Sequence, residues 1–215
     1  MKKILLLFLV LAAALLCANE TVAYSEELLK LAAAGDAVAQ ENLATAYNDG
    51  TGVAQDLAKA FEWYLKAAQQ GRTFSQGMVA QAYFYGDGTD QDASKALYWN
   101  TLAAEGGDLD ARHMLANQYY MGDGTAPDLE QALFHYTKAA EQGYALAQYS
   151  LAGMYAKGEG TEQNLKMAYF WYLCADHFGL DYAIFSCADM EAQMSADDIA
   201  LVKKTFRDAI SGLNK

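Results

Sequence analysis

The sequence predicts an all-α solenoid, in which antiparallel helix hairpins stack side by side into a right-handed superhelix. Three observations predict it. Each period holds two runs of small and aromatic residues at helical spacing, and a short glycine-rich segment separates the two runs. The third is a glycine that recurs with a period of 36 residues, at Gly35, Gly71, Gly107, Gly143 and Gly179. Because one hairpin cannot bury both of its faces, such units stack.

The first run of each period has the spacing of a buried helix face. Its columns are Ala44, Ala80, Ala116 and Ala152, the aliphatic residue before each of them, and Tyr47, Tyr83, Tyr119 and Tyr155. Residues three to four positions apart lie on one side of a helix. Small residues there let a neighbouring helix come close, and tyrosine supplies a larger packing surface.

A glycine pair then ends the first helix, and a capping residue begins the second. The pairs are Gly50/Gly52, Gly86/Gly88, Gly122/Gly124 and Gly158/Gly160, and the caps are Asp56, Asp92, Asp128 and Asn164. Glycine tolerates positive φ, so it suits the end of a helix and a chain reversal. Aspartate and asparagine side chains accept hydrogen bonds from the free N–H groups at a helix start.

These signals divide the chain into repeats with a cap at each end. Residues 24–34 form an N-terminal capping helix with Ser25 as its N-cap. Residues 35–178 hold four repeats, at 35–70, 71–106, 107–142 and 143–178. Residues 179–215 form a partial repeat and a capping helix over 196–210, which Ser195 begins.

The columns together resemble the Sel-one-like repeat, a relative of the tetratricopeptide repeat. The first copy carries nearly all of the pattern, in Ala39, Leu43, Ala44, Tyr47, Gly50, Gly52, Asp56, Lys59, Ala60, Trp63, Tyr64, Ala67, Ala68 and Gly71. The third copy departs at Gln131 and His135, and the fourth at Asp176. The resemblance covers about residues 35–194.

The resemblance implies an α-solenoid that binds other proteins or peptides. Some exported cysteine-rich members, in Helicobacter, are described as penicillin-binding with weak β-lactamase activity. A weak β-lactam-binding or β-lactamase-like hydrolase is therefore the alternative function. Those members place a disulfide in every repeat, whereas this chain has one candidate pair.

The N-terminus predicts export. Met1, Lys2 and Lys3 precede an unbroken apolar run from Ile4 to Leu16, which is typical of a signal peptide. We expect residues 1–23 to be removed by cleavage after Ala23, with Ala18 as the alternative. The mature chain is then periplasmic or secreted, without stable membrane insertion. Lipidation at Cys17 is disfavoured, because Leu16 stands where a small residue is needed.

The remaining cysteines, Cys174 and Cys187, are an even pair in an exported chain, which favours a disulfide between them. A buried free thiol is the alternative, because Cys187 fills a column that leucine or valine holds elsewhere.

The sequence predicts no catalytic, metal or cofactor site. His113, His135 and His177 fall in different columns, without metal-ligand spacing. No serine-hydrolase or zinc-protease motif occurs in the mature chain. The net charge of −12 disfavours nucleic acid and anionic membranes as partners.

Function is instead expected where the copies disagree, on the first-helix face that points away from the repeating stripe. Related solenoids line their concave surface with first helices, and such surfaces hold peptides or partner helices. The predicted protein- or peptide-binding residues are Asn42, Thr45, Met78, Gln81, Phe84, His113, Asn117, Tyr120 and Tyr149.

Overall fold

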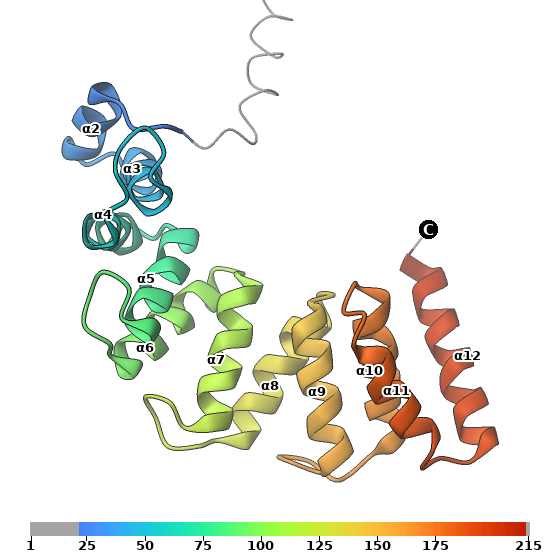
Figure 1. Ribbon diagram of the computed structural model, residues 1–215. Coiled ribbons are helices and arrows are strands. Elements are labelled where there is room, and N and C mark those ends of the chain that lie inside the picture. Colours follow the sequence, from blue (N-terminus) through green and yellow to red (C-terminus); the bar gives the residue numbers. More distant parts are fainter. Residues whose placement is uncertain (1–21, 214–215) are drawn as a thin grey trace, which may run out of the picture. The chain divides into compact units, whose positions relative to one another are not determined.

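The computed structural model describes residues 22–213, and the elements in this range are α-helices (Figure 1). The predicted signal peptide therefore lies, apart from its last two residues, outside the described residues. The chain forms two compact units, whose described parts are residues 22–91 and 92–213. Within each unit, helices that follow one another in the chain pack together as hairpins, which confirms the predicted all-α solenoid.

The first unit contains the capping helix, the first repeat and half of the second. Its helices are α2 (Glu26–Ala33), α3 (Ala37–Asp49), α4 (Leu57–Gln69) and α5 (Thr73–Tyr85). Ser25 caps α2 as predicted, because its hydroxyl accepts a hydrogen bond from the backbone N–H of Leu28 at 3.1 Å.

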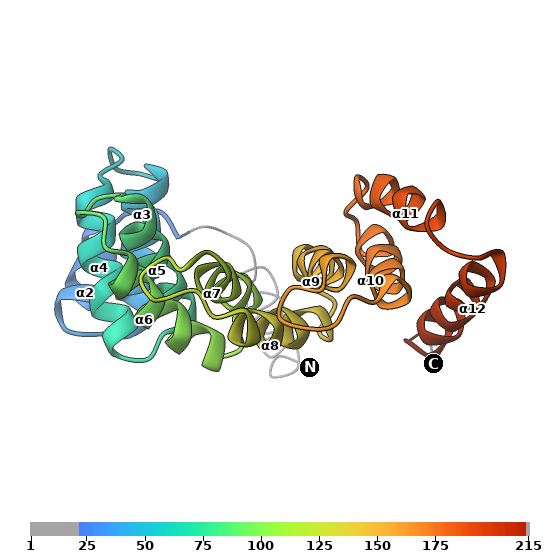
Figure 2. The same ribbon diagram turned by 90° about the horizontal axis from the view of Figure 1, so that it is seen from below.

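The second unit begins at the N-cap of α6 and continues to the C-terminal cap. Its helices are α6 (Ala93–Glu105), α7 (Leu109–Met121), α8 (Leu129–Ala140), α9 (Ala145–Lys157), α10 (Leu165–His177), α11 (Ala183–Glu191) and α12 (Ala196–Leu213). Helix α10 contacts α9, α11 and α12 (Figure 2). Helix α12 continues through Gly212 to Leu213, so the predicted end at residue 210 is too early. No described helix is long and apolar enough to cross a bilayer.

The repeating columns form the core, as predicted. The four alanines of the central column, from Ala44 to Ala152, are fully buried, and so are the aliphatic residues before them. Burying a leucine-sized side chain stabilises a fold by about 1.5–3 kcal/mol. Repeating this contribution at every hairpin explains how a chain of short helices holds together without a central core.

The predicted caps are also confirmed. The carboxylate of Asp56 accepts a hydrogen bond from the backbone N–H of Lys59 at 3.0 Å, and Asp92, Asp128 and Asn164 do the same in their repeats. The backbone N–H and ammonium of Lys59 lower the pKa of Asp56. The first glycine of each loop ends its helix in the left-handed conformation, with φ of 70° at Gly50.

The second glycine of a loop lies against the preceding repeat. A Cβ atom on Gly88 would come closer than 3.0 Å to the carbonyl group of Leu57, the first residue of α4. Gly124 and Gly160 meet the equivalent carbonyl groups of Ala93 and Leu129 in the same way. These glycines therefore join neighbouring hairpins as well as turning the chain.

A partly buried ion pair joins the first two repeats. Arg72 stands at the N-cap position of α5 but gives no side-chain cap; instead its guanidinium donates to the carboxylate of Glu41 on α3. The hydroxyl of Ser75 donates to the same carboxylate at 2.7 Å. Glu41 is 8% exposed and Ser75 fully buried, so the carboxylate depends on these two donors.

Arg72→Ala is expected to destabilise residues 22–91 by about 1–3 kcal/mol, because it leaves a buried carboxylate with Ser75 as its remaining donor. The Arg72 side chain is 40% exposed, and solvent screening places the value below that of a fully buried pair. Urea unfolding of R72A, E41Q and the double variant measures the coupling. Additive effects of the two changes would contradict the assigned pairing.

Candidate functional site

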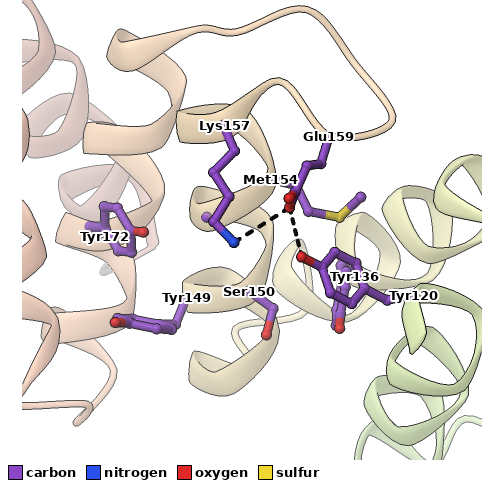
Figure 3. A pocket seen from close by; sticks show the side chains of 9 residues that line it. Tyr120, Tyr136, Tyr149, Ser150, Met154, Lys157, Glu159 and Tyr172 are labelled. Carbon is purple, nitrogen blue, oxygen red and sulfur yellow. Dashed lines mark hydrogen bonds and ion pairs between the residues drawn. The ribbon is translucent and has the colours of Figure 1, made fainter.

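A pocket in the second unit lies among the helices of the third and fourth repeats (Figure 3). Its volume is about 300 Å³. We call it the tyrosine pocket, and its lining residues are Tyr120, Tyr136, Tyr149, Ser150, Gly153, Met154, Lys157, Glu159 and Tyr172. First helices α7 and α9 supply Tyr120 and Tyr149, second helices α8 and α10 supply Tyr136 and Tyr172, and the loop after α9 supplies Glu159.

One side of the tyrosine pocket is polar and charged. The hydroxyl of Tyr120 donates to Oε2 of Glu159 at 2.7 Å, and Nζ of Lys157 lies 3.6 Å from the same oxygen (Figure 3). This hydrogen bond is the first cause of a raised pKa for Tyr120. Tyr120 therefore stays protonated at neutral pH, beside a cation and an anion that are both reachable by a partner.

The other side of the pocket is aromatic. The rings of Tyr149 and Tyr172 pack edge to face with centroids 5.1 Å apart, and Tyr149 makes the same contact with Tyr182. The hydroxyl of Tyr149 lies 3.2 Å from Oγ of Ser186. Burial raises the pKa of Tyr136 to about 12 and also raises that of Tyr172. These phenols are therefore fixed, protonated hydrogen-bonding groups.

The pocket is widened by one position that lacks a side chain. Gly153 lies in the middle of α9, and the positions equivalent to it in the first three repeats hold Thr45, Gln81 and Asn117. A Cβ atom on Gly153 would meet the Tyr172 hydroxyl at 3.7 Å, an ordinary contact. The space in front of it is therefore larger than at the equivalent position of the second repeat, where Gln81 lines a pocket of about 210 Å³.

The structure brings four of the predicted binding residues to this region. Tyr120 and Tyr149 line the pocket. His113 lies 3.3 Å from the hydroxyl of Ser150 and packs against the ring of Tyr136. Asn117 accepts a hydrogen bond from the Tyr136 hydroxyl.

The other predicted residues lie in the first unit and do not form one site. Met78 and Gln81 line a pocket of about 210 Å³, at the positions that Ser150 and Gly153 occupy in the fourth repeat. Thr45 lies 3.0 Å from the Tyr64 hydroxyl at the edge of that pocket. Asn42 lines a separate hollow beside α2, and Phe84 packs against Tyr85.

Sequence reasoning missed the second-helix tyrosines and the loop carboxylate. Tyr136 and Tyr172 occupy the second-helix column of Tyr64, which belongs to the repeat pattern, yet they line the pocket. Glu159 stands between the two glycines of a turn, Gly158 and Gly160. The available signal was that the turn's middle residue is acidic in three copies, at Asp87, Asp123 and Glu159.

His113 and Ser150 lie within hydrogen-bonding distance of each other, as the general base and the nucleophile of a hydrolase would. Burial, however, lowers the pKa of His113 to about 4. A general base works best with a pKa near the working pH, so this imidazole is a weak one. Ser150 also lies within α9, where the helix itself uses the backbone N–H groups that an oxyanion would need.

The predicted disulfide is not formed in this structure. Cys174 on α10 and Cys187 on α11 are both free and buried, 7% and 3% exposed. Burial raises the pKa of each thiol to about 12. The even count of cysteines suggested a bridge, but Cys187 fills an aliphatic core column and packs there as a small apolar side chain.

Residues 22–213 contain no cluster of three or more His, Cys, Asp or Glu side chains that could hold a metal ion.

Comparison with known proteins places the repeats in a family. The model of the Sel1 repeat matches residues 37–71, 73–108, 109–144 and 145–175. No curated protein matches the chain.

Two solved structures are similar over most of the chain. A Sel1 repeat protein from Oxalobacter formigenes is 34% identical over 74% of this chain and 64% of its own, with a TM-score of 0.69. A protective antigen of uropathogenic Escherichia coli with an SLR fold is 29% identical over 86% of this chain and 40% of its own, with a TM-score of 0.75. The chain thus spans about two thirds and two fifths of these proteins. On the four repeat matches, which cover more than half of its length, the chain belongs to the Sel1 repeat family.

Proposed function

We propose that this Sel1 repeat scaffold binds a peptide segment of a protein partner on its first-helix face, with the tyrosine pocket as the main anchor. The observation that carries the proposal is the pocket itself. It combines aromatic walls, protonated phenols and one reachable ion pair, and two of its tyrosines, Tyr120 and Tyr149, stand at positions where the copies differ. Tyrosines of this kind dominate binding energy at protein interfaces because they offer large contact area with little loss of side-chain freedom.

The chemistry of the pocket suits one apolar side chain with its flanking peptide groups. Met154 and the tyrosine rings offer apolar contact, while the hydroxyls of Tyr120 and Tyr149 offer hydrogen bonds. Lys157 is 62% exposed, so it adds selectivity for a nearby carboxylate rather than much affinity.

We further propose that binding takes place outside the cytoplasm. This rests on the signal-like N-terminal segment, with cleavage after Ala23 or Ala18 and delivery to the periplasm or the medium. N-terminal sequencing of the chain recovered from periplasm and culture fluid tests it. Recovery of an uncleaved chain from the cytoplasm would refute export.

Narrowing or truncating the pocket is expected to weaken peptide binding at least tenfold. Peptides selected from a displayed library on the purified chain supply the probe, and fluorescence polarisation measures the dissociation constant. Gly153→Gln installs the residue of the second repeat and narrows the pocket, while replacing a helical glycine favours the fold. Tyr120→Ala removes the hydroxyl and ring that contact Glu159.

Phe134→Ala is the matched control, because Phe134 is exposed on α8 and does not line the pocket. Circular dichroism confirms the fold of each variant. Unchanged affinity in both G153Q and Y120A, or an equal loss in F134A, would remove the tyrosine pocket as the anchor.

The alternative, a β-lactamase-like hydrolase, has the Ser150–His113 contact in its favour and the low pKa of His113 against it. A chromogenic β-lactam distinguishes the two functions. We expect no turnover above the background of Ser150→Ala. Saturable hydrolysis that S150A abolishes would replace the scaffold proposal with an enzymatic one.

A further inference from the structure

A second cavity in the unit of residues 92–213 lies between the helices of the fourth repeat and the terminal helix α12. We call it the α10–α12 cavity, and its volume is about 510 Å³. Phe170, Trp171 and Cys174 of α10, Phe178 after it, Gln148 of α9 and Ile210 of α12 contribute to its mainly apolar lining. A cavity of this size falls in the range of small-molecule sites.

Two buried polar atoms at this cavity have no hydrogen-bond partner among the described residues. They are Oε1 of Gln148, an acceptor, and Nε1 of Trp171, a donor. The Gln148 side chain is 2% exposed, and its amide nitrogen is held by the carbonyl oxygen of Ala140 at 3.1 Å. Because buried polar groups are almost always paired, an unpaired acceptor and an unpaired donor in one apolar cavity point to a ligand that supplies both partners.

The first repeat shows one way in which the fold satisfies this glutamine. Gln40 is the equivalent of Gln148, and its amide nitrogen likewise donates to a backbone carbonyl group, that of Ala32. Its Oε1 accepts a hydrogen bond from Gln70 at 2.8 Å. In the fourth repeat the position of Gln70 holds Phe178. Phenylalanine has no side-chain donor, so Gln148 lacks the hydrogen-bond partner that Gln40 has. The ring of Phe178 instead adds apolar surface to the cavity.

The space itself also comes from residues that do not repeat. Cys174 occupies the position that holds Lys66, Leu102 and Lys138 in the other repeats, and a cysteine side chain is much shorter. Helix α12 closes the remaining side. It is anchored by Phe206, whose ring meets the ring of Phe170 at 6.4 Å. The cavity is therefore a feature of the last repeat and its cap.

We propose that the α10–α12 cavity binds a small uncharged molecule with an apolar ring and a secondary amide. The amide N–H would donate to Gln148, its carbonyl oxygen would accept from Trp171, and the ring would lie against Phe170 and Phe178. The charge of the cavity supports an uncharged ligand. Glu141 is the charged residue of the lining, and it already pairs with Lys138 at 3.5 Å.

N-(1-naphthyl)acetamide is a suitable probe, because it carries one naphthalene ring and one secondary amide. Its fluorescence anisotropy, measured against the full chain, is expected to rise to saturation at one site. The N-methyl form of the same compound lacks the N–H donor and is expected to bind about tenfold more weakly.

Two variants restore residues of other repeats and should abolish the site in different ways. Cys174→Leu, the residue of the second repeat, fills the cavity and is expected to prevent binding. Phe178→Gln, the residue of the first repeat, supplies an internal donor to Gln148 and removes the ring, and should weaken binding about tenfold. Phe178 is 43% exposed, so F178Q tests the proposal even if C174L folds poorly.

Tyr120→Ala, in the tyrosine pocket, serves as the control and should leave probe binding unchanged. Equal affinity for the two naphthyl compounds would overturn the amide assignment, and unchanged binding in both C174L and F178Q would overturn the site. Binding of the blocked tripeptide acetyl-alanyl-phenylalanyl-alanine amide without binding of the naphthyl probe would show a peptide site instead. Tyr120 lies in the tyrosine pocket and not in the α10–α12 cavity. Failure of the small-molecule proposal therefore leaves the peptide-binding proposal intact, and the reverse also holds.

Discussion

Gly88→Ala is expected to destabilise residues 22–91 by about 3 kcal/mol, far more than an ordinary glycine change in a loop. Two effects add. The backbone φ at Gly88 is 72°, where a side chain costs about 1–2 kcal/mol. The new methyl group would also overlap the carbonyl group of Leu57 and the backbone nitrogen of Ala58, and overpacking of this kind adds about 1–3 kcal/mol.

Gly71→Ala separates the two effects. Its φ is 86°, so the conformational cost is similar, but no atom lies within 4 Å of the added Cβ. It should therefore destabilise by about 1–2 kcal/mol. Urea unfolding followed by circular dichroism gives both values, and hydrogen exchange of peptides from α4 localises the loss. Equal values for G88A and G71A would show that the loop does not join neighbouring hairpins in the way described.

Only the turning role of these glycines is visible in the sequence. The period of 36 residues places Gly88 next to Gly86, and positive φ explains both residues equally well. The close approach depends on where the preceding hairpin lies, which is a tertiary property. Local patterns therefore predicted the helices, their caps and the core columns, whereas they could not distinguish a turn glycine from a contact glycine.

The same limit applies to the polar residues that join one hairpin to the next. Gln40, Gln76, Arg112 and Gln148 occupy one column, and each reaches back to a backbone carbonyl group at the end of the preceding second helix. In the sequence these residues are ordinary polar positions on a helix. The structure shows that they add a second hydrogen bond to carbonyl groups that also accept the backbone N–H of the closing glycine, and so they tie each first helix to the helix before it.

The sequence named only part of the tyrosine pocket and nothing of the second cavity. Tyr120 and Tyr149 line the tyrosine pocket, whereas no predicted binding residue lines the α10–α12 cavity. The size of each cavity depends on a side chain that is missing or short, at Gly153 and at Cys174. A list of aromatic residues does not reveal such a space, because it depends on what the neighbouring helices leave unfilled.

Alkylation of Cys174 and Cys187 is expected to be at least a thousandfold slower in the folded chain than in urea. The thiolate is the reactive form, and burial raises the pKa of both thiols to about 12 from an ordinary value of 9.0. At pH 8 the thiolate fraction therefore falls about a thousandfold, at ten-fold per pKa unit. Mass spectrometry after iodoacetamide treatment follows each cysteine separately.

Ala188→Cys provides a matched control, because residue 188 lies beside Cys187 on α11 but is exposed. Its thiol should react at the rate of the unfolded chain. Rapid native labelling of Cys187 would contradict its placement in the core. A mass lower by two hydrogen atoms, with no labelling even in urea, would instead show that the two cysteines are joined.

The raised thiol pKa values also predict that stability falls in alkaline solution. Below pH 9 both states keep the thiols protonated, and their contribution is fully present. Between about pH 9 and 12 the unfolded chain loses these protons while the folded chain retains them, so the free energy of unfolding falls by up to about 1.4 kcal/mol per thiol for each pH unit. Urea midpoints from pH 8 to 10.5 measure the slope. Replacing both cysteines with alanine lowers stability at pH 8 but should flatten the slope, and a slope that stays unchanged would assign it to the buried tyrosines instead.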